Sequence, residues 1–560
     1  MRKFILLFFM LGGGLMLINN CGKTDMDKQA EKFINNYVKR VKKLEKDISL
    51  SYWNAAVTGE EKYYAKYEEL VRKISDIRSD KKEFDILQKI RNSGKITESE
   101  LKREIDILYN LYLQNQIPKG LRDEIIVLST KLDKAFATHR AKVDGKEVTA
   151  NEIDKILQTS INSEERKKYW EASKEVGKLL YPDFIKLIKL RNKAAREMGF
   201  KNYYIMALET SEQSEEEILA IFDELAKLTD TPFKRIKREI DKKLAERYGI
   251  ETLELMPWHY EDPYFQGGVS IYGINLDDIY KGKDLIKIAL NFYKSIGIYL
   301  DEVIKKSDIY EKKGKNPHAF EIMIGRNGDV RVLLNIKDNA RWMDTTLHEL
   351  GHAAYSKYIS KKLPFILREE SHIFVTEAIA MMFGRLHRNP LWIEKSVGVD
   401  KDMIMGKKDE LYKSLQASQL IFSRWAQVMM RFERAAYYNP DQDLNTLWWK
   451  LKERYQYLRK PEGRDFPDFA AKIHIISDPV YYHNYMLGEL LASQLNHYIA
   501  KNIYKNGHQL FIPYYGKKEI GDFLKNKIFK NGAKDRWDKL IKKATGEELT
   551  PKYFAEQFIE

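Results

Sequence analysis

Residues 344–355 read DTTLHELGHAAY, and this stretch decides how the rest of the chain is interpreted. On a helix, residues four positions apart lie on the same face, so His348 and His352 can direct their ring nitrogens at one point. Neutral imidazoles are good zinc ligands. Glu349 directly follows the first histidine and is placed to take a proton from a water molecule at the metal. The spacing therefore predicts a helix that supplies two zinc ligands and a general base.

A catalytic zinc needs a third protein ligand, and Glu377 is the candidate. Residues 364–384 read PFILREESHIFVTEAIAMMFG, and the second half of this segment has helical periodicity. Glu377 stands among apolar neighbours, where a carboxylate is costly to bury without a cation. We expect one Zn²⁺ per chain, held by His348, His352 and Glu377. The alternative is a chance match on an ordinary helix, with Glu377 at the surface.

Three segments of residues 318–384 carry a family resemblance, and they read HAFEIMIGRNGDVRVL, TLHELGHAAY and KKLPFILREESHIFVTEAI. They resemble the angiotensin-converting-enzyme family of zinc dipeptidyl carboxypeptidases and, more weakly, the thimet and F-type oligopeptidases. The resemblance implies a large, two-lobed helical fold. It also implies a deep central cleft that admits short peptides and excludes folded proteins.

Residues 472–485 read KIHIISDPVYYHNY and resemble the family segment that stabilises the oxyanion. On that match His474 and Tyr485 have this role, which needs donors that already point at the developing charge. The assignment of Tyr485 requires one inserted residue. Without the insertion the matching position is Asn484.

The resemblance also implies contacts with the substrate. Lys472 and Tyr481 match the family residues that hold the terminal carboxylate, a task suited to an ammonium and a phenol. The third member of that trio is a glutamine, and residues 257–260 read PWHY instead, which leaves dipeptide release in doubt. His318 and Ala319 match strand residues that contact the substrate backbone.

The sequence also suggests roles for several polar residues outside the proposed zinc and substrate sites. Arg368 and Glu369 match a family pair that we expect to orient the zinc ligands. His372 and His387 have no motif support, and we interpret both as structural or surface histidines. The arginine of the family's chloride site is missing, its place falling near His483, so the sequence does not support chloride activation.

The composition is that of a folded, globular protein. The chain has 560 residues, of which 44% are hydrophobic and 32% charged. Its formal net charge is +14, but lysines are mixed with glutamates along helical faces, as in residues 39–46 (KRVKKLEK). A solvated helix face explains such a run better than a track for phosphates, so we expect no nucleic-acid partner.

Long amphipathic runs predict a mainly α protein. Two hairpins are expected, one in residues 142–148 and one in residues 318–336, which turns through Asn327-Gly328 just before the zinc helix. We find no internal repeat and no domain boundary. Residues 21–560 are therefore expected to form a single catalytic domain of two helical lobes.

The N-terminus resembles the leader of a bacterial lipoprotein. An apolar run, too short for a comfortable membrane span, follows a short positive region and precedes the chain's single cysteine, Cys21. We expect residues 1–20 to be a signal peptide and Cys21 to be lipidated. The protein would then be exported, periplasmic or at the cell surface, and anchored to a bacterial membrane. The residues before Cys21 (INN) depart from the usual pattern, and an uncleaved anchor is the alternative.

These expectations combine into one functional prediction, an exported zinc peptidase that acts on short peptides as a dipeptidyl carboxypeptidase. An endo-acting oligopeptidase is the alternative within the same class. A peptide-binding lipoprotein without turnover is the alternative from another class. The natural substrate and the oligomeric state stay open.

Overall fold

The computed structural model describes residues 23–273, 275–505 and 511–559. The N-terminal helices are α1 (Asp25–Thr58), α2 (Glu61–Arg78), α3 (Lys81–Asn92), α4 (Ser99–Gln114), α5 (Lys119–Thr138), α6 (Ala150–Thr159), α7 (Ser163–Ala172), α8 (Glu175–Glu197), α9 (Tyr203–Thr210) and α10 (Glu215–Tyr248). The next are α11 (Asp277–Tyr280), α12 (Leu285–Ser295), α13 (Asp301–Lys306), α14 (Ala340–Tyr358), α15 (Ile373–Gly384), α16 (Pro390–Trp392) and α17 (Lys401–Met405). The last are α18 (Lys408–Tyr438), α19 (Leu444–Gln456), α20 (His474–Ser477), α21 (His483–Ile499), α22 (Lys518–Phe523), α23 (Trp537–Thr545) and α24 (Lys552–Phe558).

The prediction of a mainly α protein is confirmed. In the described ranges, the named strands form two antiparallel hairpins, β1 (Ala141–Val143) with β2 (Lys146–Val148), and β3 (Phe320–Ile324) with β4 (Asp329–Leu333). Both lie where the sequence predicted a hairpin. Left-handed backbone at Gly325, Arg326 and Gly328 makes the turn between β3 and β4.

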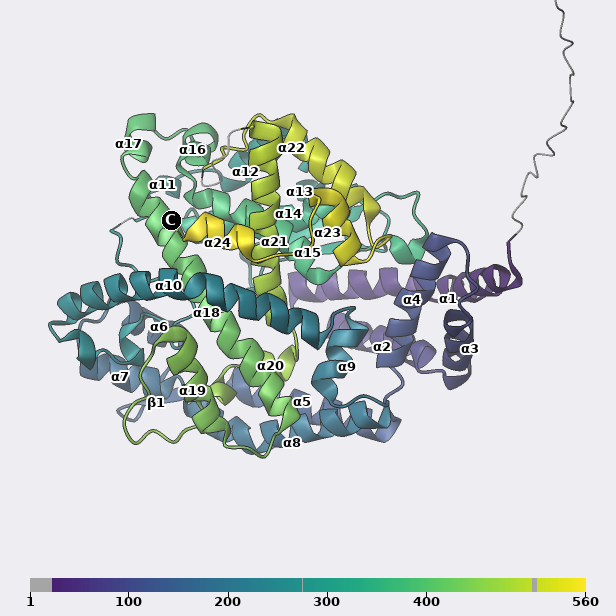
Figure 1. Ribbon diagram of the computed structural model, residues 1–560, viewed down its shortest axis with the longest axis horizontal. Helices are drawn as coiled ribbons and strands as arrows, with labels where there is room; N and C mark the ends of the chain where they lie inside the picture. The colour runs from purple at the N-terminus through teal and green to yellow at the C-terminus, as the bar shows by residue number, and fades with distance from the viewer. Residues whose placement is uncertain (1–22, 274, 506–510, 560) are drawn as a thin grey trace, which may run out of the picture.

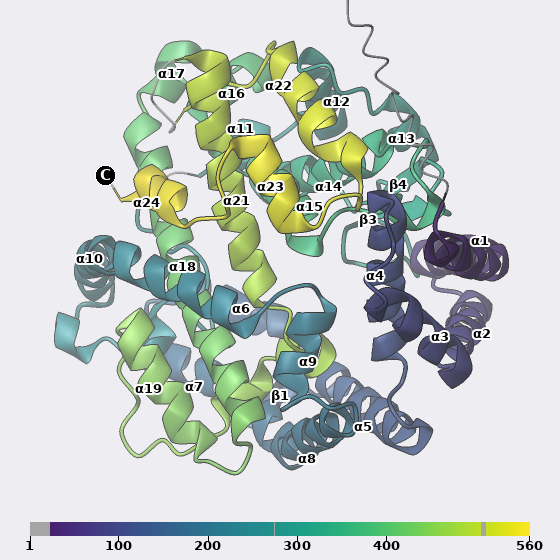
Figure 2. The ribbon, with the colours of Figure 1, turned by 45° about the vertical axis from the view of Figure 1, so that its right-hand side comes forward.

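The helices gather in two groups, which matches the predicted two-lobed architecture (Figures 1 and 2). The first group contains α12 to α15 together with α22 and α23, and the second contains α5, α7, α8 and α19. The long helix α18 runs from one group to the other in both views. The deep cleft implied by the family resemblance stays a prediction.

A close approach of three helices fixes the position of the predicted zinc ligands. A Cβ atom on Gly351 of α14 would lie 2.8 Å from the Cα atom of Ala380 in α15. A Cβ atom on Gly488 of α21 would lie 3.2 Å from the Cβ atom of Glu377. Because glycine stands at both positions, α14 and α21 can each pack directly against the backbone of α15.

The apolar residues around this contact are fully buried. Leu347 and Leu350 of α14 and Phe374 and Ile379 of α15 belong to one large hydrophobic core. Burial of side chains of this size contributes about 1.5–3 kcal/mol each. The helix pair that carries the predicted zinc site is therefore anchored in the main hydrophobic core.

The expected signal peptide, residues 1–20, and Cys21 lie outside the described residues. Their roles stay predictions. Within the described part of the chain, every helix is either too short or too polar to cross a bilayer.

Replacement of Gly351 by alanine should push α14 and α15 apart. The added methyl group overlaps the backbone of Ala380, and overpacking of this kind costs about 1–3 kcal/mol. We expect a lower melting temperature in differential scanning calorimetry and weaker Zn²⁺ binding. The matched control is Gly120→Ala in α5, where a Cβ atom meets nothing within 4 Å, and equal melting temperatures for the two variants would contradict the packing described here.

Candidate metal centre and active site

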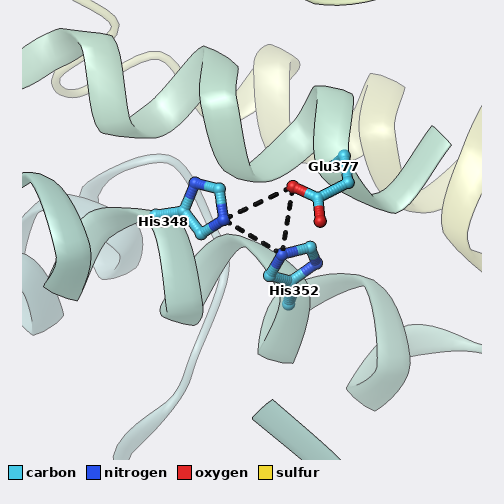
Figure 3. A group of neighbouring side chains, drawn as sticks. All are labelled: His348, His352 and Glu377. Atoms are coloured by element: carbon cyan, nitrogen blue, oxygen red, sulfur yellow. Dashed lines mark hydrogen bonds and ion pairs between the residues drawn. The ribbon is translucent and has the colours of Figure 1, made fainter. Parts of the chain in front are cut away.

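The predicted zinc ligands come together (Figure 3). Asn339 caps the N-terminus of helix α14, because its side chain accepts a hydrogen bond from the backbone amide of Trp342. The helix places His348 and His352 one turn apart. The Nε2 atoms of the two histidines are 3.2 Å apart. The Oε2 atom of Glu377 lies 3.5 Å from Nε2 of His348 and 3.8 Å from Nε2 of His352.

These distances fit a tetrahedral metal ion. Ligand atoms at about 2.0–2.2 Å from zinc in tetrahedral directions are separated by about 3.3 Å. The three ligand atoms of the cluster, which lie within 4.8 Å of one another, are already close to that spacing. The side chains of His348 and Glu377 are 27% and 12% exposed, so solvent and substrate can reach the cluster. Two imidazoles and one carboxylate are a ligand set of catalytic zinc sites with an open position.

The hydroxyl of Thr376 orients one of the ligands. Its Oγ1 atom lies 2.7 Å from Nδ1 of His352, which leaves Nε2 of that ring free to bind a metal. Arg368 and Glu369, predicted to have such a role, have other partners. Arg368 donates to a backbone carbonyl at 2.8 Å, and Glu369 pairs with Arg326 at 2.8 Å. The sequence interpretation missed Thr376 because a threonine beside an apolar helix face carries no motif.

Glu349 lies beside the cluster and is 8% exposed. Burial raises the pKa of its carboxyl group to about 7, an effect that the nearby His348 opposes. The backbone amide of Glu321 in β3 also hydrogen-bonds to this carboxyl and lowers its pKa. The edge of β3 that does not pair with β4 is therefore directed toward Glu349.

His318 and Ala319 directly precede β3. His318 is exposed, and its backbone amide donates to Oδ1 of Asn316 at 2.9 Å. Ala319 is half-buried. Both stand at the start of the strand whose free edge faces Glu349, which is the place that the predicted contact with substrate backbone requires.

Aromatic rings pack against one another beside the cluster. Tyr485, in the first turn of α21, has its ring centroid 5.1 Å from that of Tyr481 and 5.4 Å from that of Tyr482. Burial raises the pKa of Tyr485 to about 12, and the charge of Glu377 adds to the effect, so the phenol keeps its proton. The ring of His474 lies 5.4 Å from Tyr482.

His474 has the properties of a neutral donor. Burial, together with the charge of the neighbouring Lys472, lowers its pKa to about 4. Its Nδ1 atom is buried without a hydrogen-bond partner among the residues that the structure describes. A buried imidazole nitrogen without a partner is unusual, and it is available to a bound ligand.

Lys472 contacts a glutamine, Gln266, that the sequence interpretation did not find because it looked for one at residues 257–260. Its ammonium group donates to Oε1 of Gln266 at 2.7 Å and lies 5.6 Å from the ring centroid of Tyr482. Gln266 is in the same irregular loop as His259, which is buried and instead accepts a hydrogen bond from a backbone amide. The rings of Tyr264 and Trp425 lie at 5.1 and 5.5 Å from the same ammonium group. Of the two neighbouring tyrosines, Tyr482 therefore lies beside Lys472, whereas the predicted Tyr481 packs against Tyr485.

His372, His387 and His483, which the sequence interpretation named without a catalytic role, have structural partners. Nε2 of His372 lies 2.9 Å from the carbonyl oxygen of Ser211, and Nδ1 of His387 lies 2.7 Å from that of Gly384. Both rings are thus held by backbone groups, in agreement with their interpretation as structural. Nε2 of His483 lies 2.8 Å from Oε1 of Gln213 in a buried polar network.

Replacement of Thr376 by valine should weaken metal binding. The variant keeps the shape of the side chain but removes the hydroxyl that orients His352, and loss of such a partner typically costs 10–100-fold in metal affinity. Competition with a chromophoric chelator gives the dissociation constant for Zn²⁺. The control is Thr346→Val in α14, whose buried hydroxyl has no partner in the described ranges, and an unchanged Zn²⁺ affinity of Thr376→Val would show that the hydroxyl has no orienting role.

Comparison with known proteins gives a family. A family model described as angiotensin-converting enzyme matches residues 24–259 and 274–558.

The angiotensin-converting enzyme of Haematobia irritans exigua is 23% identical over 443 residues, covering 73% of this chain and 72% of that protein. That of Sus scrofa is 22% identical over 434 residues, covering 71% of this chain and 32% of its own length, so the chain spans about a third of that relative. An inactive angiotensin-converting enzyme-related protein of Caenorhabditis elegans is 30% identical over 134 residues, 23% of this chain and 15% of that protein. The chain belongs to the angiotensin-converting-enzyme family of zinc metallopeptidases.

Proposed function

We propose that the protein is a zinc peptidase that cleaves short peptides near a free C-terminus and releases dipeptides. The observation that carries this proposal is the convergence of His348, His352 and Glu377 within 4.8 Å, with Glu349 beside them. These are the ligands and the base that hydrolysis of an amide by water requires.

His348, His352 and Glu377 would hold the ion, which supplies Lewis-acid polarisation of the scissile carbonyl and lowers the pKa of water. Glu349 accepts the proton of the attacking water and then donates it to the leaving amine. The backbone amide of Glu321 in β3 favours the charged form of this carboxyl group, whereas its burial favours the protonated form.

The developing oxyanion needs donors, and Tyr485 and His474 are the candidates. Tyr485 keeps its phenolic proton, and it lies close enough to Glu377 for the carboxylate to affect its pKa. His474 is neutral and is connected to Tyr485 through the ring of Tyr482. Groups held in this way by packing require little reorganisation as charge develops, which is the basis of electrostatic catalysis.

Lys472, Gln266 and Tyr482 support recognition of a terminal carboxylate. The three groups offer an ammonium, an amide and a phenol in one place, and Tyr482 is held by a hydrogen bond from Nε1 of Trp425 at 2.6 Å. A carboxylate accepts strong hydrogen bonds from such donors. Gln266 supplies the glutamine that residues 257–260 lack. Because the trio that holds a terminal carboxylate is then complete, it favours a dipeptidyl carboxypeptidase over an endo-acting oligopeptidase.

Replacement of Glu349 by glutamine should abolish most of the activity and leave the metal in place. A general base typically contributes 10²–10⁴-fold, so we expect kcat on a quenched fluorescent peptide to fall by about that factor. Zinc content by inductively coupled plasma mass spectrometry should not change. A wild-type protein that contains zinc and cleaves no peptide would favour the alternative of a peptide-binding protein without turnover.

Replacement of Lys472 by methionine should impair substrates with a free C-terminus. Hydrogen bonds to charged groups contribute about 1.5–3 kcal/mol, which corresponds to about a 10–100-fold rise in KM. The same peptide with an amidated C-terminus lacks the charge and should be a poor substrate for both proteins. Equal cleavage of the free and the amidated peptide by the wild type would contradict the proposed carboxypeptidase activity.

The same lysine predicts a pH dependence. Burial lowers the pKa of Lys472 to about 8, so its ammonium form is present below that pH and is lost above it. We therefore expect kcat/KM for free-carboxyl peptides to fall as the pH rises through about 8. Lys472→Arg, which stays charged, is the control and should remove this decline.

A further inference from the structure

Residues 474–485 carry all the proposed oxyanion donors and one side of the carboxylate site, yet little regular structure supports them. Helix α20 contains only four residues, and α21 begins at His483. The chain between the two helices must place His474, Tyr482 and Tyr485 within fractions of an ångström for catalysis. Two buried side chains from other helices form hydrogen bonds to the backbone of this segment.

Arg191 of α8 forms hydrogen bonds to the backbone in the first half of the segment. It is 4% exposed, and its guanidinium donates to the carbonyl oxygen of Ile475 at 3.1 Å and to that of Ile476 at 2.6 Å. Because α20 is so short, no further helical turn follows whose backbone amides could donate hydrogen bonds to these two carbonyl oxygens. A third hydrogen bond, to the hydroxyl of Tyr437 at 3.2 Å, fixes the guanidinium itself.

Glu433 of α18 forms a hydrogen bond to the backbone in the second half of the segment. It is 2% exposed, and its Oε1 atom accepts a hydrogen bond from the backbone amide of Val480 at 2.7 Å. Burial raises the pKa of Glu433 to about 8, but either protonation form keeps an oxygen that can accept this bond. A buried backbone amide needs such a partner.

The bond to Glu433 stabilises an unusual backbone conformation. Val480 has φ of 58°, in the left-handed region, which a β-branched residue rarely adopts. Conformations of this kind cost about 1–3 kcal/mol and persist only where the surroundings enforce them. Because Val480 directly precedes the two tyrosines, this bend decides that Tyr482 faces Lys472 while Tyr481 packs against Tyr485.

We propose that Arg191 and Glu433 are positioning residues that clamp residues 474–485 and set which tyrosine enters the carboxylate site. The clamp presupposes the peptidase activity proposed above. It acts through the backbone alone, and neither side chain of the clamp touches the substrate.

Glu433→Met and Glu433→Gln form the matched pair that tests the clamp. Methionine keeps the volume but has no acceptor for the amide of Val480, whereas glutamine keeps a carbonyl oxygen. At a temperature well below the melting point of each variant, we expect Glu433→Met to lose 10-fold or more in kcat/KM on a free-carboxyl peptide. Glu433→Gln should retain activity within about threefold, since a neutral acceptor suffices. Zinc affinity should be unchanged in both variants.

A second control removes another contact of the same segment. The exposed hydroxyl of Ser477 donates to Oδ1 of Asp133 at 2.7 Å, and Ser477→Ala should behave as the wild type. Equal activity of Glu433→Met and the wild type, or an equal loss in both Glu433 variants, would overturn the clamp. A loss of activity in Glu433→Met that tracks only its unfolded fraction would do the same.

Binding separates the clamp from the proposed function. Isothermal titration calorimetry measures the affinity of a dipeptide with a free carboxylate relative to its amide. We expect Glu433→Met to lose this preference and Glu433→Gln to keep it. An inactive wild type that still shows the preference would refute the peptidase activity and leave the clamp standing, whereas a preference unaffected by Glu433→Met, or absent from the wild type, would refute the clamp.

Discussion

The close approach of α14 and α15 is the constraint on which the site depends. Two imidazoles one turn apart follow from helix geometry alone, but a metal site also needs a carboxylate from a different element. Gly351 allows the backbone of α15 to come against α14, and Glu377 then faces both rings at 3.5 and 3.8 Å. Gly488 brings α21 against the other side of α15, and this contact carries Tyr485 to the same place. The absence of a side chain at Gly351 and Gly488 thus allows the close helix contacts that position the proposed zinc site.

Burial shifts the pKa values of the charged groups at the two ends of the site, the zinc cluster and Lys472, and the shifts have opposite signs. It raises the pKa values of Glu349 and Glu377 at one end and lowers that of Lys472 at the other. Each of these groups is held where its charged form is disfavoured unless an opposite charge arrives. A cation at the carboxylates and an anionic C-terminus at Lys472 would supply those charges. The packed rings of Tyr482 and Tyr485 connect the two ends, since Tyr482 lies beside Lys472 and the charge of Glu377 acts on Tyr485.

Features that depend on local periodicity could be predicted from the sequence. The mainly helical fold, both hairpins, and the pairing of His348 with His352 follow from spacings of two, three and four residues. Glu377 could be chosen because a lone acid in an apolar helix needs a cation. The family resemblance contributed His474, Tyr485 and Lys472, which local periodicity cannot single out.

Features that depend on loops and on contacts distant in sequence could not be predicted in this way. Gln266 reaches Lys472 across about two hundred positions of sequence from an irregular loop without periodicity. Val480 adopts a left-handed conformation that its side chain disfavours, and Tyr482 lies beside Lys472 where Tyr481 was expected. Thr376 is recognised as a partner of His352 only when the two helices are seen together. In each case, tertiary structure overrides the local preference of the residue.

The most direct test of the central claim is zinc K-edge X-ray absorption spectroscopy on the protein loaded with one equivalent of Zn²⁺. The arrangement of His348, His352 and Glu377 predicts two imidazole nitrogens and oxygen ligands at about 2.0–2.2 Å, with loss of one imidazole shell in His352→Ala. A spectrum without imidazole scattering, or one that His352→Ala leaves unchanged, would contradict the account.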